Sequence, residues 1–171
     1  MNRLQLATLI SWAGDTGLEG RKCLQKVVFF LQQAGCPLDC QYRLHYFGPY
    51  SRDVADACDE MVAAGLVVET GGPRNGAMQY DYSLKPAVRV VLEQSPDPQL
   101  QPFETLGKEL LNESLWSLEL GSTILFFHGQ ISDWSEAFAK ACQFKKVDTT
   151  NESSQYALAL AQRVSGQAVC Q

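Results

Sequence analysis

Apolar positions recur along the chain with two different periods, and together they predict an α+β protein. A spacing of three and four residues predicts helices over 2–13, 18–34, 51–64, 86–94, 102–111, 114–128, 133–142 and 152–164. Alternation of apolar and polar residues predicts strands over 41–47, 66–70 and 78–84. The last two strands flank a glycine-rich turn at 71–76, so they predict a β-hairpin with an exposed tip, the wing.

The stretch from Tyr46 to Ser51 joins the first strand to the helix at 51–64. Gly48-Pro49 is expected to break the strand, because proline lacks the N–H that a sheet ladder needs. Ser51 stands where a side chain can cap the following helix. Strand, turn, helix and hairpin in this order predict a winged-helix-like domain with a small β-hairpin wing.

Two prolines separated by one residue, Pro96 and Pro98, cannot continue a helix and mark a predicted domain boundary. We therefore expect a winged-helix-like domain at 1–95 and a helical domain packed on it at 99–171. The helix at 114–128 is apolar on nearly every side, which is typical of a helix buried by its neighbours.

The chain has 171 residues, 46% of them hydrophobic and 19% charged, so it can build a core and does not have a disordered composition. No apolar run approaches the roughly 20 residues that span a bilayer. With no signal peptide legible, we expect a cytoplasmic protein that does not bind membranes. Six cysteines are too few for a disulfide scaffold. Cys36, Cys40 and His45 form only one loose group, so we predict neither a metal nor a cofactor.

The sequence carries no legible catalytic motif. His45 and His128 have no acid or nucleophile at a motif spacing, and Ser122-Thr123 lacks the glycine context of a nucleophile elbow. Glycine motifs that bind phosphates are absent. We therefore predict no catalytic residues and a non-enzymatic protein, with a hydrolase or nuclease as a weaker alternative.

The charge pattern argues against DNA as a partner. The formal net charge is −5, whereas a nucleic-acid binder usually has a basic surface. In a DNA-binding winged helix the helix at 51–64 would meet the phosphates, yet its predicted outward positions are Arg52, Asp53, Asp56, Asp59 and Glu60. The alternative, a DNA-binding transcriptional regulator, would use the basic second helix and the wing, where Arg74 is backed by Lys85 and Arg89.

Two groups of residues are candidate binding sites. Arg21, Lys22 and Lys26 cluster near the start of the second helix, either as a solvated face whose stems cover the core or as an anion-binding site. Aromatic residues gather beside Gly48-Pro49, either as core packing or as a partner-binding patch, since tyrosine is frequent in interface hot spots. The predicted partner-binding surface consists of Tyr46, Phe47, Pro49, Tyr50, Asp53 and Asp56.

Three segments resemble a known bacterial family. The R-K-x-L-Q-K helix followed by four hydrophobic residues at 21–30, the F-G-P-Y-S turn at 47–51 and the L-E-x-x-S-T helix at 118–123 resemble YwgA-like proteins. More distantly, the first two are similar to the Panacea domain of antitoxins related to SocA. The resemblance implies a winged-helix-like N-terminal part and a helical C-terminal part. It implies no settled activity and no catalytic residues for YwgA-like proteins, and partner binding, including toxin neutralisation, for Panacea proteins.

Together these observations predict a non-enzymatic protein-interaction module of regulatory, defence-linked or antitoxin-like type. Its partner would be another protein. Homodimerisation fits the apolar C-terminal helices, because winged-helix proteins often pair.

Overall fold

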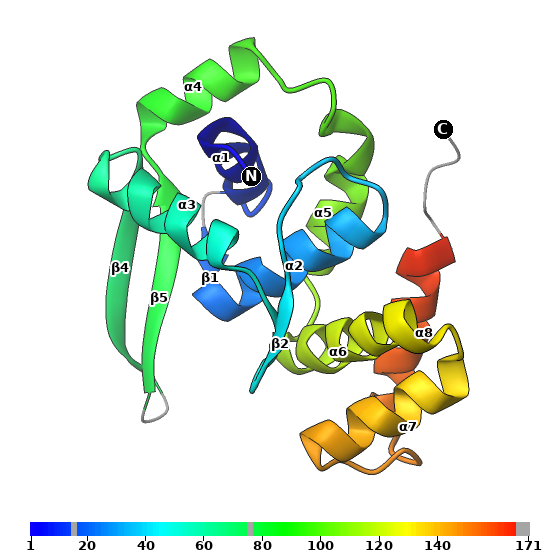
Figure 1. The fold of residues 1–171 in the computed structure, drawn as a ribbon. Helices are drawn as coiled ribbons and strands as arrows, with labels where there is room; N and C mark the ends of the chain where they lie inside the picture. The colour runs from blue at the N-terminus through cyan, green and yellow to red at the C-terminus, as the bar shows by residue number, and fades with distance from the viewer. Residues whose placement is uncertain (15–16, 75–76, 167–171) are drawn as a thin grey trace.

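Eight α-helices and two small antiparallel sheets make up residues 1–14, 17–74 and 77–166, the part of the chain that the computed structural model describes (Figure 1). The α+β class and all eight predicted helices are confirmed. In chain order the elements are α1 (Arg3–Ser11), β1 (Leu18–Glu19), α2 (Arg21–Gln33), β2 (Arg43–His45), β3 (Gly48–Tyr50), α3 (Arg52–Ala63), β4 (Val67–Arg74), β5 (Ala77–Leu84), α4 (Pro86–Gln94), the 3-10 turn η1 (Gln101–Phe103), α5 (Glu104–Leu111), α6 (Leu115–Ile131), α7 (Trp134–Lys145) and α8 (Glu152–Gly166).

Helix α2 lies at the centre of the fold. It packs against α3 and β1 on one side and against α5, α6 and α8 on the other (Figure 1). Its residues 23–31 are all buried. A helix that is covered on every side explains the run of five apolar residues at 27–31, which an amphipathic surface helix would not carry.

The chain enters α2 differently from the prediction, which began this helix at residue 18. Leu18 and Glu19 instead form β1, which pairs antiparallel with β5. Gly17 and Gly20 flank the strand with φ of 75° and 83°, a left-handed conformation that glycine adopts without a steric penalty. A Cβ on Gly17 would lie 2.6 Å from the backbone oxygen of Tyr82. The close approach to β5 therefore overrides the helical spacing.

The three-stranded sheet has the order β1-β5-β4. Strand β4 extends to Arg74, so the prediction that 71–74 belongs to a turn is wrong, whereas the strand at 78–84 is confirmed. β4 is an edge strand, which tolerates Pro73 because one side of it needs no backbone donor. Residues 75–76 of the predicted turn, and the side chain of Arg74, lie outside the described part.

A second hairpin replaces the predicted break at Gly48-Pro49. β2 pairs antiparallel with β3, placing Leu44 opposite Pro49, and Tyr46-Phe47 form the turn between them. Because the sheet has only two strands, each strand has an outer edge where the missing N–H of proline costs little. The predicted strand at 41–47 is thus shorter and turns back on itself.

Helix α6 organises the C-terminal part and is buried along most of its length, as its all-round apolar sequence predicts. α7 and α8 pack on it, and α6 also contacts α2 and β3. Figure 1 shows α6, α7 and α8 gathered in the lower right of the view. The boundary at Pro96 and Pro98 stays a prediction. None of the described helices is long and apolar enough to cross a membrane.

Candidate functional site: the hairpin at residues 43–50

Two side chains of α2 hold the backbone that leaves the second hairpin. The Gln25 amide donates to the Ser51 carbonyl and accepts from the Ser51 N–H, both at 2.8 Å. The Lys26 ammonium donates to the Pro49 carbonyl at 2.6 Å. Ser51 is the N-cap residue of α3, as predicted by position, but its hydroxyl makes no capping bond. Its backbone bonds to Gln25 fix the start of α3 instead.

Helix α6 closes the other side of the hairpin at Gly48. A Cβ at this position would lie 2.6 Å from Thr123 Oγ1 and 3.3 Å from the Glu119 carbonyl oxygen. Thr123 is itself fixed, because its hydroxyl donates to that same carbonyl at 2.6 Å. The three segments that carry the sequence resemblance therefore meet at one place, where their polar groups anchor the hairpin.

The tip of the hairpin is aromatic and exposed. Tyr46 is 78% exposed and Phe47 36%, with ring centroids 5.0 Å apart and planes perpendicular. The Lys22 ammonium lies 3.6 Å from the centroid of the Phe47 ring, within the range of a cation–π contact. An anchored base thus presents two aromatic rings to solvent.

Two cavities flank Phe47. The first, the α2 cavity, has a volume of about 190 Å³ and lies between α2, the hairpin and α3. The second, the α7 groove, has a volume of about 230 Å³ and lies between the tip, α6 and the end of α7. Ten large apolar side chains are exposed in the described part of the chain. Four of them line the α7 groove, namely Tyr46, Phe47, Trp116 and Phe144.

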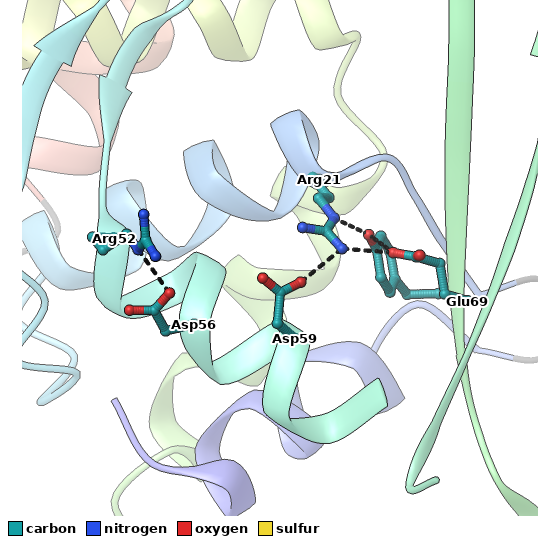
Figure 2. A network of polar contacts seen from close by, with 6 residues as sticks. Arg21, Arg52, Asp56, Asp59 and Glu69 are labelled. Carbon is teal, nitrogen blue, oxygen red and sulfur yellow. Dashed lines mark hydrogen bonds and ion pairs between the residues drawn. The ribbon is translucent and has the colours of Figure 1, made fainter. Parts of the chain in front are cut away.

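The other predicted surface residues are less available. Pro49 is buried and Tyr50 half-buried. An Asp53 carboxylate oxygen accepts from the Gln41 N–H at 2.7 Å, and the Asp56 carboxylate pairs with Arg52 at 2.7 Å along the same helix (Figure 2). The structure therefore brings Tyr46 and Phe47 together at the tip and leaves Asp53 and Asp56 on the separate acidic face of α3.

Arg21 ties α2 to α3 and to the sheet. Its guanidinium reaches an Asp59 oxygen on α3 and a Glu69 oxygen on β4, both at 2.8 Å (Figure 2). It also donates a hydrogen bond to the Tyr82 hydroxyl. The Tyr82 hydroxyl in turn donates to Glu69. Hydrogen bonds from Tyr82 and then Arg21 lower the pKa of Glu69. Since two carboxylates already compensate Arg21, we assign it to the scaffold.

Replacing Arg21 tests that assignment. Arg21→Met removes the contacts to both carboxylates, and we expect the free energy of unfolding to fall by about 1–2 kcal/mol, because the ion pairs are partly exposed and screened. Urea denaturation measures the change. Arg52→Met, which breaks the exposed pair with Asp56, is the matched control and should change stability little. Equal stability of the two variants would show that Arg21 does not link the elements.

Lys26 corrects the prediction that the basic residues of this helix form a solvated face. Lys26 is only 2% exposed. Desolvation by burial is the main cause that lowers the pKa of Lys26 to about 8, against the opposing field of Glu119. Lys22 is exposed and Arg21 half-exposed. The three cations therefore have three different environments rather than one.

The cysteines that sequence analysis weighed as metal ligands, Cys36 and Cys40, are buried free thiols. Burial raises the pKa of Cys36 to about 12, so its thiol is protonated at neutral pH. Within residues 1–14, 17–74 and 77–166, no group of three or more His, Cys, Asp or Glu side chains could hold a metal ion.

Comparison with known proteins adds one relative. No family model matches the chain. The chain is 31% identical over 124 residues to the uncharacterized protein YwgA of Bacillus subtilis (strain 168), an alignment that covers 72% of this chain and 74% of the relative.

Proposed function

The chain belongs to the YwgA family, and we propose that it acts by binding another protein through the aromatic tip, Tyr46 and Phe47. The observation that carries the proposal is the 78% exposure of Tyr46 on a hairpin whose base is anchored by Gln25 and Lys26. A large exposed aromatic ring is costly in water and is a frequent anchor of protein interfaces.

The anchoring of the hairpin supports this function further. A loop that is already held in its bound conformation loses less conformational entropy on association, which favours affinity. Trp116 and Phe144 extend the apolar surface from the tip along the α7 groove. The exposed Lys146 adds a cation to the rim of the groove, whereas Lys145 is paired with Glu119 at 3.0 Å. This composition favours a partner segment with apolar and acidic side chains.

We propose in addition that the N-terminal part is a winged helix. Apart from the hairpin β2-β3 inserted between α2 and α3, the element order α1-β1-α2-α3-β4-β5 supports it, as does the strand order β1-β5-β4. For the biological role of this protein binding, we propose a regulatory, defence-linked or antitoxin-like function. The distant resemblance to Panacea proteins supports it.

DNA binding, the alternative, has less support. The outward residues of α3 are mainly acidic, and Asp59 and Asp56 are held on that face by Arg21 and Arg52 (Figure 2). The second helix offers little to phosphates, because Lys26 is buried and Arg21 is compensated. Acidic surfaces repel a polyanion, so this face does not favour DNA.

Photo-crosslinking in cells tests the proposal. The crosslinking amino acid p-benzoyl-phenylalanine at position 46 should yield a discrete protein adduct, which mass spectrometry identifies. Position 156 is the matched control, since Tyr156 is also exposed, at 52%, but lies on α8. An adduct at both positions, or a nuclease-sensitive adduct at 46, would contradict specific protein binding by the tip.

Side-chain truncation supplies a quantitative test. The double variant Tyr46→Ala/Phe47→Ala should weaken capture of the crosslinked partner at least tenfold, because it removes both aromatic anchors. Its melting temperature should stay close to that of the wild type, since both rings are exposed. Unchanged affinity in a folded double variant would overturn the proposal.

A further inference from the structure

The Lys26 ammonium is a buried charge whose compensation is incomplete. Within the described part of the chain, the Pro49 carbonyl is the one polar group that accepts a hydrogen bond from this ammonium, and no carboxylate lies within ion-pair distance. Transfer of an ammonium out of water is costly unless the charge is paired. A carbonyl dipole compensates only part of the hydration free energy that the ammonium loses, so a bound anion would stabilise the charge further.

The α2 cavity, which Lys26 lines, has the polarity of a site for an amphipathic anion. None of its described lining residues is acidic, and most of the exposed lining surface is apolar. Leu24, Val54 and Ala55 supply part of that apolar wall. Lys22 lines the same cavity and keeps its ammonium over the Phe47 ring, so a second cation is available.

We propose that the α2 cavity binds a small apolar monocarboxylate, with its carboxylate on Lys26 and Lys22 and its hydrocarbon chain against Leu24 and Val54. The cavity volume of about 190 Å³ corresponds to roughly six water molecules at about 30 Å³ each, which suits a short-chain acid such as hexanoate rather than a long-chain fatty acid. A single negative charge fits better than a phosphate dianion, because the apolar wall would desolvate a dianion at greater cost.

Titration of the wild-type protein with hexanoate, followed by ¹H–¹⁵N NMR, tests this site. Saturable shifts should appear at residues of the cavity, among them Ala55 and Tyr50. Hexan-1-ol, which has the chain without the charge, and acetate, which has the charge without most of the chain, should each bind at least tenfold more weakly. Equal binding of hexanol would contradict anion recognition, and equal binding of acetate would contradict the apolar subsite.

Two lysine variants identify the cation. Lys26→Met keeps a side chain of similar length and should weaken hexanoate binding at least tenfold. Lys108→Met is the matched control, because Lys108 lies on α5, pairs with Glu104 and does not line the α2 cavity, and it should bind as the wild type does. Wild-type affinity in a folded Lys26→Met variant would overturn the proposal.

A measurement on the unmodified sequence keeps the test independent of variant folding. With ¹³C-labelled lysine, Lys26 is recognisable because its pKa is lowered to about 8, whereas an unperturbed lysine titrates near 10.4. Saturating hexanoate should raise that pKa, since a bound carboxylate favours the charged ammonium. An unchanged pKa in the presence of bound hexanoate would show that the anion does not contact Lys26.

Discussion

Gly48→Ala is expected to lower the free energy of unfolding by about 2–5 kcal/mol. A residue with a side chain at a φ of 93° costs about 1–2 kcal/mol. The added Cβ would also lie 2.6 Å from Thr123 Oγ1 and 3.3 Å from a backbone oxygen of α6, and overpacking of this kind costs about 1–3 kcal/mol. The hairpin and α6 must then separate, which also displaces the aromatic tip.

Gly35→Ala separates the two causes. Gly35 has a φ of 98°, but nothing lies within 4 Å of a Cβ at this position. It therefore carries the backbone cost alone, and urea denaturation should find it about 1–3 kcal/mol more stable than Gly48→Ala. Thr123→Ala removes the atom in closest conflict, so in the Gly48→Ala background it should cost less than in the wild type. Equal destabilisation by the two glycine variants would argue against tight packing of the hairpin on α6.

The helices were predictable because their signal is local. Apolar spacing within one segment reports which face of a helix is buried, and it located α3 and α6 together with their buried faces. Strand β1 has no such signal. Its two residues are extended because Gly17 approaches Tyr82, which is 65 positions later in the chain. A pairing over that distance leaves no periodic pattern in an isolated segment.

The candidate site was predictable in its location but not in its contacts. The turn at 47–51 and the basic helix were identified from sequence, and the structure brings them together through Gln25 and Lys26. Lysine is usually exposed, so its residue type favoured a solvated face, whereas Lys26 is buried. Trp116 lies in a helix that was predicted to be buried, and Phe144 lies beyond the predicted end of the helix at 133–142. Their exposure beside the tip becomes visible only once α6 and α7 are placed.

The burial of Lys26 should also make stability depend on pH in an unusual direction. Its pKa is about 8 in the folded protein and 10.5 as the reference for the unfolded chain, a difference of 2.5. Between these values the unfolded chain binds more protons, so the free energy of unfolding contributed by this group rises with pH. The rise is complete above pH 10.5 and amounts to about 3–4 kcal/mol, at about 1.4 kcal/mol for each pKa unit.

Other titratable groups make the protein less stable as pH rises, so the experiment must cancel their contributions. Burial raises the pKa of Cys23 and of Cys58 to about 11, so their unfolded thiols ionise first and stability falls as pH rises through this range. The difference in unfolding free energy between the wild type and Lys26→Met removes these contributions, because both proteins contain the same thiols. Urea denaturation under reducing conditions from pH 6.5 to 10.5 should show the wild type gaining stability relative to the variant. A difference that stays constant over this range would mean that the Lys26 ammonium is already fully compensated, which would remove the physical reason for an anion in the α2 cavity.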